Sequence, residues 1–209
     1  MLTLLDYGPS ANCLKVRILL RQLGTEFARE PVDIFAGESR TDEYLAFNPA
    51  GRTPALRLDD GRVLAESNAI LLYLAEGTAF LPDDRVRRAH VHRWLFFEQN
   101  LLEPNVGTAR FWHLTGREAQ QQEAFSHRLQ AGKDALAVLD RGLAGREFLV
   151  DDRYSAADVA LYAYTHVAHE AGVDMTAYPA IAPWLARVEA TDGFENDLEP
   201  YPANAHVTA

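Results

Sequence analysis

The feature that most constrains the fold of this chain is a change of sequence pattern near residue 77. Before it, short strand-like runs alternate with segments whose apolar residues recur at helical spacing, and after it almost no strand signal occurs. The stretch 77–84 contains Gly, Pro and two Asp, which is typical of a linker. We therefore predict an α/β domain over residues 1–76, a linker over 77–85 and an all-helical domain over 86–209.

The first domain is predicted to alternate strands and helices. Its elements, in order, are a strand at 2–5, a helix beginning at Ser10 or Asn12, a strand at 27–34, a helix at 41–47, hairpin strands at 55–58 and 62–65, and a helix capped by Ser67. This order, βαβ-α-ββ-α, predicts a small mixed sheet with helices on both faces. In the second domain, helices are expected over 86–111, with Pro104 kinking or breaking it, and over 125–143, 155–168 and 179–188.

Charge balance and cysteine content limit the classes of function. The chain has 20 Lys and Arg against 30 Asp and Glu, a formal net charge of −10, which argues against nucleic acid as the main partner. The longest apolar run, 69–75, is too short to cross a bilayer, and we expect no secretory signal. The single cysteine, Cys13, excludes a framework of internal disulfides. We therefore expect a cytoplasmic protein that binds neither nucleic acid nor a membrane.

Motifs that hold nucleotides or metals are missing from the sequence. It contains no phosphate loop ending in Gly-Lys-Ser/Thr, no Gly-x-Ser-x-Gly elbow and no GxGxxG after a strand. His90 and His92 should point to different faces of a helix, and the pair His166 and His169 lacks a third ligand nearby in the sequence. No metal site is therefore predicted.

The segment Ser10-Ala-Asn12-Cys13 follows the first strand and opens a helix. Free backbone N–H groups and the helix dipole at such a position stabilise an anion. The spacing is that of a Cys-x-x-Cys redox site whose leading, nucleophilic position is Ser, so the segment could stabilise the thiolate of a bound ligand. The alternative is an ordinary Ser N-cap followed by a small buried cysteine.

Two further segments of the first domain carry chemistry. Asn48-Pro-Ala-Gly51-Arg52-Thr53-Pro54 stands before the hairpin, and Pro54 directly precedes a strand, where a cis peptide would be a specific device. Glu66-Ser67 places a carboxylate beside a helix N-terminus, although the same pair is common as simple capping. The joint occurrence of the three segments, in this order and at these spacings, favours one shared binding site.

Together these segments resemble the cytosolic glutathione S-transferase superfamily, and the resemblance covers almost the whole chain. The first domain is similar to its thioredoxin-like domain and the remainder to its all-helical domain. The Ser-x-Asn pattern is similar to bacterial serine-type members, and the run after Glu66-Ser67 continues the match. Ser155-Ala-Ala-Asp158 resembles the capping box of the family's buried helix, so Asp158 is expected to support folding and not to act as a catalytic acid.

The resemblance implies that glutathione is the co-substrate, with no metal. The ammonium group of its γ-glutamyl end suits Glu66, and the carboxylate of the same end suits Ser67 at the helix N-terminus. The cysteinyl backbone would pair with the main chain of Thr53, provided that Pro54 is cis. Cations for the glycyl carboxylate are available at Arg52 and Arg40.

Three residues are candidates for the group that activates the glutathione thiol. Ser10 is favoured because it opens the helix, whereas the alternatives are Asn12 with backbone amides, or Tyr7 as in tyrosine-type members. A hydrogen bond from Ser10 to the thiolate, about 1.5–3 kcal/mol, would lower the thiol pKa by roughly one to two units. Cys13 is expected to be a buried helix residue, with a mixed-disulfide role as the alternative.

The second substrate and the assembly follow from the resemblance. Arg110, Phe111 and Tyr7 are candidates for the electrophile site, although Phe111 could be helix core and Arg110 a surface charge. The implied protein is a homodimeric transferase that conjugates glutathione to an electrophile, as in detoxification. The alternatives are a glutathione-dependent disulfide reductase or peroxidase, and a non-enzymatic binding or regulatory protein on the same fold. Retention of the glutathione-site residues favours an enzyme.

Overall fold

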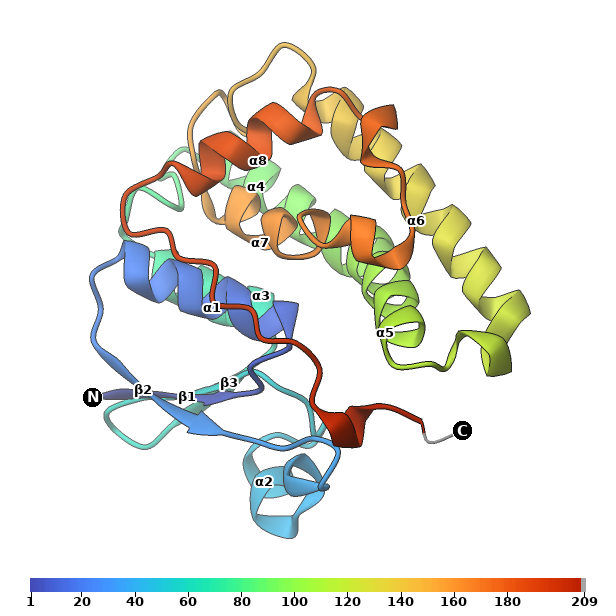
Figure 1. Cartoon of the computed structure of the whole chain (residues 1–209). Coiled ribbons are helices and arrows are strands. Elements are labelled where there is room, and N and C mark those ends of the chain that lie inside the picture. Colours follow the sequence, from blue (N-terminus) through green and yellow to red (C-terminus); the bar gives the residue numbers. More distant parts are fainter. Residues whose placement is uncertain (208–209) are drawn as a thin grey trace. The chain divides into compact units, whose positions relative to one another are not determined.

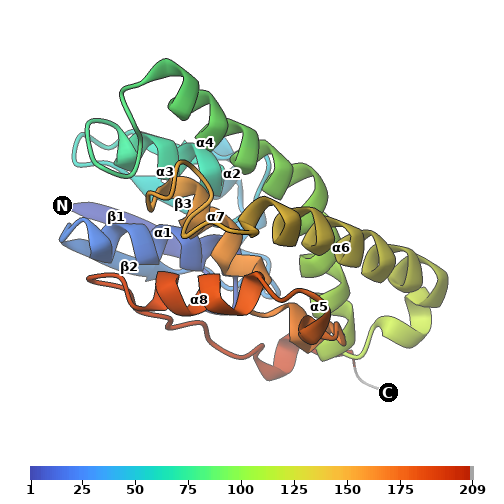
Figure 2. The same cartoon turned by 90° about the horizontal axis from the view of Figure 1, so that it is seen from above.

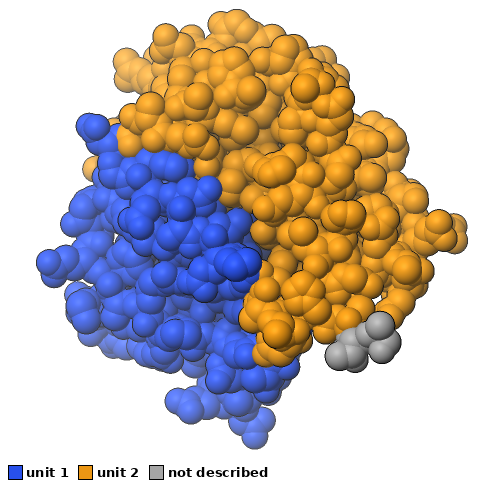
Figure 3. All heavy atoms as spheres, viewed as in Figure 1, with its two compact units in different colours: residues 1–76, 192–200 blue, residues 77–191, 201–209 orange. Residues whose placement is uncertain are grey.

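The computed structural model describes residues 1–207, which divide into two compact units (Figure 3). Unit 1 comprises residues 1–76 and 192–200, and unit 2 comprises residues 77–191 and the segment that begins at Tyr201. The break after Glu76 falls at the start of the expected linker. Residues 192–200 belong to unit 1, a return of the chain that no pattern in the sequence indicated.

Unit 1 contains the mixed sheet that the sequence predicts (Figure 1). The strands are ordered β2-β1-β3-β4, with β1 parallel to β2, and β3 antiparallel to both β1 and β4. The elements are β1 Leu2–Asp6, α1 Ala11–Gln22, β2 Phe27–Pro31, a 3₁₀ helix Glu38–Arg40, α2 Asp42–Phe47, β3 Ala55–Arg57, β4 Val63–Ala65 and α3 Ser67–Ala75. Strand β2 ends earlier than predicted because its partner β1 ends at Asp6, which pairs with Pro31.

Apolar side chains on both faces of this sheet hold the helices. Successive residues of a strand point to opposite faces. Leu4 and Leu56 therefore pack with residues of α1 and α3, whereas their sequence neighbours Leu5 and Ala55 pack with Tyr44 of α2. Figure 1 shows α1 and α3 on one side of the strands and α2 on the other, so the prediction of helices on both faces is confirmed.

The regular secondary structure in the described residues of unit 2 is helical, apart from the isolated bridge between Val150 and Arg153, and loops join the helices (Figure 2). Its elements are α4 Arg85–Phe97, a π-helix Glu98–Gly107, α5 Thr108–Leu114, α6 Gln122–Leu143, α7 Ala156–Thr165, α8 Ile181–Glu189, and short 3₁₀ turns at Glu118–Gln121, Ala168–Ala171, Met175–Ala177 and Ala203–Ala205. Within residues 1–207, every helix is too short or too polar to span a membrane.

Two alternatives were predicted at Pro104, a kink or a break of the helix, and the break is wrong. Pro104 has no N–H to donate, yet the chain from α4 to α5 stays helical and widens into the π-helix Glu98–Gly107. The side-chain amide of Asn105 donates to the Leu101 carbonyl at 2.7 Å, so a side chain supplies one of the bonds in this irregular turn. The proline therefore changes the winding of the helix and does not end it.

The capping box at the start of α7 is confirmed. The Ser155 side chain accepts from the backbone of Asp158, and the Asp158 carboxylate accepts from the Ser155 backbone N–H at 3.0 Å. All ten residues of α7 are buried, as expected for a central helix that is apolar nearly all round. Asp158 thus has a structural position at the centre of unit 2.

Candidate active site

Ser10 ends the loop that connects β1 to α1. Its backbone N–H donates to the Tyr7 carbonyl at 2.8 Å, and its Oγ accepts from the backbone N–H of Cys13 at 3.3 Å. Ser10 is therefore the N-cap of α1, as the simple interpretation proposed. Capping does not exclude ligand binding, because the oxygen accepts from the helix while the O–H of the same hydroxyl remains a donor.

The thiol of Cys13 points into the core of unit 1. Its side chain is fully buried, and its Sγ accepts from the Tyr7 backbone N–H at 3.4 Å. Burial raises the pKa of the Cys13 thiol to about 12, with Asp6 acting in the same direction and hydrogen bonds to Tyr7, Ser10 and Thr53 acting against it. A thiol that is protonated and inaccessible is a poor nucleophile, which agrees with the expected buried role.

Glu66 and Ser67 do not divide the capping role as the sequence pattern suggested. The N-cap position of α3 is Glu66, whose side chain makes no cap hydrogen bond, and Ser67 is the first helical residue. Glu66 is exposed and has φ of 71°, a region that costs a non-glycine residue about 1–3 kcal/mol. The Glu66 carboxylate thus lies exposed at the N-terminus of α3.

The Ser67 hydroxyl connects the N-termini of α3 and α1. It is buried and donates to Oδ1 of Asn12 at 3.2 Å, while its own Oγ accepts from the ammonium group of Lys15 at 3.4 Å. Two of the predicted site residues are therefore brought together by a direct bond. Lys15 is fully buried and was missed by the sequence reasoning. The available signal was a lysine between Leu14 and Val16, on the apolar side of an amphipathic helix.

The loop before β3 is anchored through the carbonyl of Arg52. That oxygen accepts from the hydroxyl of Tyr44 at 2.7 Å and from the amide of Asn48 at 2.7 Å. The Thr53–Pro54 peptide is cis, which meets the condition set for pairing with the main chain of Thr53. These contacts place the half-buried Thr53 beside the first turn of α1, because the side chain of Thr53 hydrogen-bonds to the thiol of Cys13.

The two candidate cations of this loop have different surroundings. Arg52 is exposed. Arg40 is also exposed, but its Nη1 donates to the Ala50 carbonyl at 3.1 Å and fills the space beside Gly51, where a Cβ would meet it. Gly51 also has φ of 59°, so this close approach needs glycine. Arg40 therefore stabilises the loop through its bond to the Ala50 carbonyl, independently of any ligand.

The three candidates for the electrophile site are buried to different degrees. In unit 1, Tyr7 is 7% exposed, and its ring packs against Phe35 at 6.1 Å between centroids. In unit 2, Arg110 is not a surface charge: it is 3% exposed and donates to Glu170 at 2.5 Å. Phe111, half-buried, meets the ring of Tyr201 edge-on at 5.6 Å.

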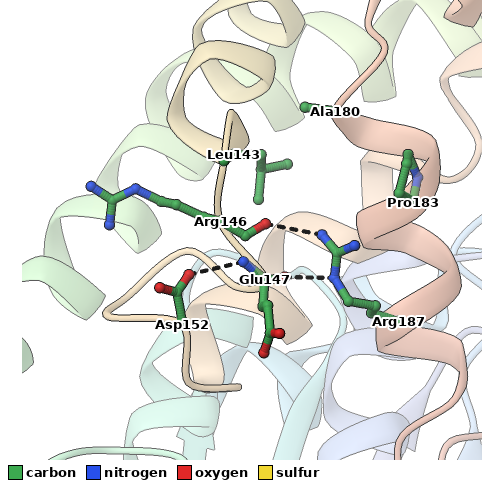
Figure 4. Close-up of a pocket in the computed structure, with 8 residues that line it drawn as sticks. Leu143, Arg146, Glu147, Asp152, Ala180, Pro183 and Arg187 are labelled. Atoms are coloured by element: carbon green, nitrogen blue, oxygen red, sulfur yellow. Dashed lines mark hydrogen bonds between the residues drawn. The ribbon is translucent and has the colours of Figure 1, made fainter.

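A hollow of about 650 Å³ in unit 2 does not involve any predicted site residue (Figure 4). Its polar groups already bond to one another: Arg187 donates to the carbonyls of Glu147 at 2.9 Å and Arg146 at 3.1 Å, and Asp152 accepts from the Glu147 N–H at 2.8 Å. Figure 4 shows these bonds closing the loop after α6. The hollow is therefore a feature of loop packing and is a weaker site candidate than the helix N-termini of unit 1.

Metal ligands do not gather anywhere in the part of the chain that the structure describes. His166 stacks on Tyr162 at 4.5 Å between ring centroids, and its Nδ1 faces the Tyr162 carbonyl at 2.9 Å. Burial lowers the pKa of His166 to about 4, so the ring is neutral at physiological pH. This histidine packs as a structural residue.

The fold and this site define a protein with a thioredoxin-like unit, whose helix N-termini form a candidate anion site, followed by a helical unit. Family models for the N-terminal and C-terminal domains of glutathione S-transferases match residues 9–76 and 102–192. The chain belongs to the glutathione S-transferase family.

Similar proteins agree with this assignment. The crystal structure of a glutathione S-transferase from Pseudomonas fluorescens [Pf-5] has a TM-score of 0.92 and 40% identity, covering 95% of this chain and 99% of that one. A glutathione transferase from Burkholderia graminis, with two glutathione molecules bound per subunit, has a TM-score of 0.81 and 30% identity, covering 92% and 85%.

Two curated relatives carry different activities in their names. Disulfide-bond oxidoreductase YfcG of Escherichia coli (strain K12) is 29% identical over 194 residues, 89% of each chain. A maleylacetoacetate isomerase of Rhizobium meliloti (strain 1021) is 33% identical over 200 residues, 92% of this chain and 93% of that protein. Family membership supports a glutathione-dependent enzyme, and the relatives differ in the reaction named.

Proposed function

We propose that this protein is a glutathione transferase that holds glutathione on unit 1 and activates its thiol for attack on an electrophile. The observation that carries the proposal is the bond between Ser67 and Asn12, which joins the N-termini of α3 and α1 into one positively polarised surface. Glu66 would bind the ligand ammonium, and Ser67 with the α3 amides would bind the adjacent carboxylate. Thr53 and Arg52 would hold the cysteinyl backbone and the glycyl carboxylate.

Ser10 is the proposed activating group, because its hydroxyl can donate to a ligand sulfur while the α1 amides face the same region. The glutathione thiol loses its proton to solvent, and the resulting thiolate attacks the electrophilic carbon. A leaving group departs with the bonding electron pair; in an epoxide, the C–O bond of the attacked carbon breaks and the oxygen keeps the pair as an alkoxide that takes a proton from solvent. We expect this chemistry in the cytoplasm, where thiols remain reduced.

A disulfide reductase is the second candidate, favoured by the relative named as a disulfide-bond oxidoreductase. Because Cys13 is fully buried with a pKa of about 12, such a reaction would use glutathione thiols alone. One glutathione thiolate attacks the disulfide and releases a substrate thiolate. A second glutathione then resolves the mixed disulfide, which leaves glutathione disulfide and a second substrate thiol.

Retention on immobilised glutathione is the first test, because a non-enzymatic protein without a glutathione site would pass through. The retained protein is then assayed with aryl halides, epoxides, peroxides, mixed disulfides and a maleyl compound that isomerises from cis to trans. Conjugation should be the fastest reaction. Turnover of mixed disulfides alone would replace the transferase by the reductase, and isomerisation alone would favour the activity in the name of the Rhizobium relative.

Replacing Glu66 with alanine should weaken glutathione binding by about 2 kcal/mol, or roughly 30-fold in Kd, because the ligand ammonium loses its charged partner. Stability should change little, since alanine at φ of 71° is strained as glutamate is. Titration calorimetry measures the affinity, and Glu26→Ala, an exposed glutamate on a loop of unit 1, is the matched control. Equal affinities in the two folded variants would remove Glu66 from the site.

We propose a two-fold homodimer, in agreement with the family resemblance. Sedimentation at micromolar concentration should give about twice 23.3 kDa. Phe96 is 68% exposed and Leu101 50% exposed in unit 2, which leaves apolar surface available for burial. Phe96→Asp should therefore favour the monomer, whereas Val138→Asp, an apolar residue of α6 that is 37% exposed, serves as the control. A wild-type monomer would contradict this prediction.

A further inference from the structure

The segment 192–200 is fastened to unit 1 by charged groups, and Figure 1 shows it running beside α1. Asp197 accepts from Arg17 Nε at 2.6 Å, from Arg21 Nη2 at 2.6 Å and from Arg29 Nη1 at 3.3 Å. Burial acts to raise the pKa of Asp197, but the hydrogen bonds from Arg21 and Arg17 outweigh it and hold the pKa below its ordinary value. Asp197 is therefore an ionised partner at the centre of this contact.

Arg17 links Asp197 to the end of β1. Its side chain is fully buried, and its guanidinium donates to Asp6 Oδ1 at 2.7 Å as well as to Asp197. Asp6 is also buried and is the last residue of β1. A buried guanidinium is stable only while its charged partners stay in place, so the orientation of Arg17 depends on both carboxylates. One comes from the sheet and the other from the returning segment.

Arg17 and the segment 192–200 also hold the loop that leads to Ser10. The Gly8 carbonyl accepts from Arg17 Nη2 at 3.2 Å and from the backbone N–H of Glu199 at 3.3 Å. A Cβ at Gly8 would collide with the carboxylate of Glu199, so the segment lies directly against this glycine. Gly8 is two residues before Ser10, whose N–H closes the turn onto Tyr7. The path of the loop is therefore set by α1 and by the segment 192–200 together.

We propose that Asp197 is a positioning residue for Ser10: by orienting Arg17, it fixes the Gly8 carbonyl and thereby the direction of the Ser10 hydroxyl. The inference rests on the proposed function, in which that hydroxyl meets the glutathione thiol. A donor acts on a thiolate only when it is held within about 0.5 Å of its productive position, and a shift of about 1 Å can cost on the order of 100-fold in rate. Charge-assisted bonds supply this orientation.

The test compares Asp197→Ala and Asp197→Asn with the wild type in three measurements. These are kcat with a reactive electrophile, the pKa of bound glutathione from the ultraviolet absorbance of its thiolate, and glutathione affinity by calorimetry. Asp197→Ala should lower kcat by about 10-fold and raise the pKa of the bound thiol. Affinity should stay within about two-fold, because Glu66 and Ser67 are not disturbed. Asp197→Asn keeps an acceptor for Arg17 and should give a smaller change in the same direction.

Glu195→Gln is the matched control. Glu195 belongs to the same segment and pairs with Arg21 at 3.0 Å, but it is 60% exposed at its side chain. Its variant should keep the wild-type kcat and thiol pKa. If Asp197→Ala lowers only the melting temperature, the segment is structural and the proposal is wrong; should that variant fail to fold, Asp197→Asn decides by the same readouts. A wild type that does not bind glutathione would overturn the proposed function, and this inference with it.

Discussion

Replacing Asp158 with alanine is expected to lower the free energy of unfolding by about 3–5 kcal/mol. The carboxylate is fully buried, and its Oδ1 accepts from the Leu149 N–H at 3.1 Å and from Trp184 Nε1 at 3.0 Å. Its Oδ2 accepts from the Ser155 N–H at 3.0 Å and from the Ser155 hydroxyl at 3.1 Å. Alanine would leave three buried N–H donors without a partner. Such a loss is a large part of the roughly 5–15 kcal/mol that stabilises a typical protein.

Asp84, the exposed N-cap of α4, is the control that separates the effect of burial from that of helix capping. Asp84 accepts from the N–H groups of Val86 and Arg87 at the start of α4, but water can replace it, so Asp84→Ala should cost only about 1 kcal/mol. Urea unfolding of both variants gives the comparison. Burial raises the pKa of Asp158 to about 6, yet its role here is that of an acceptor. Equal losses in the two variants would show that the buried network contributes nothing beyond a cap.

Replacing Ser10 with alanine should lower turnover by about 10–1000-fold while changing glutathione affinity little. The variant loses one hydrogen-bond donor to the thiolate but keeps the backbone amides and dipole of α1, so activity should fall without vanishing. The rising limb of the pH–rate profile should move to higher pH, because the bound thiol would ionise less readily. Loss of the cap bond to Cys13 should also cost about 1 kcal/mol of stability, so rates are compared well below the melting temperature.

Tyr7→Phe is the matched variant for this experiment, since it removes a hydroxyl from the same loop. It should leave the rising limb near the wild-type position. A shift in Tyr7→Phe together with none in Ser10→Ala would reverse the assignment in favour of the tyrosine-type mechanism. If neither variant shifts the limb, Asn12→Ala becomes the deciding substitution. Asn12 lies in the first turn of α1, as Ser10 does at its N-cap, and it bonds to Ser67 of α3.

Much of the fold was predictable because it is encoded by residues close together in the sequence. The runs of strand-like and helical spacing predicted the order βαβ-α-ββ-α of the first domain, as the structure has it. The Ser155–Asp158 capping box spans only three positions. Such signals survive in a single sequence because the interacting groups are neighbours along the chain.

Local signals were misleading where a distant partner competed for the same group. Ser67 had the pattern of a cap, but in the folded chain its hydroxyl bonds to Asn12 instead. A charged side chain such as that of Arg110 is usually exposed, but its ion pair with Glu170 allows Arg110 to be buried. In both cases tertiary contacts supplied a hydrogen bond or a counter-charge that local propensity does not contain.

The sequence by itself determined the order of strands and helices, the family, and the short segments that form the candidate glutathione site. Only the tertiary structure decided how those segments are held: that Lys15 is buried beside Ser67, and that Asp197 pairs with Arg17 from 180 positions away. Spacing along the chain reports which face of an element is apolar. It carries no information on which of many charged residues will be desolvated together, because that choice depends on how the whole unit packs around them.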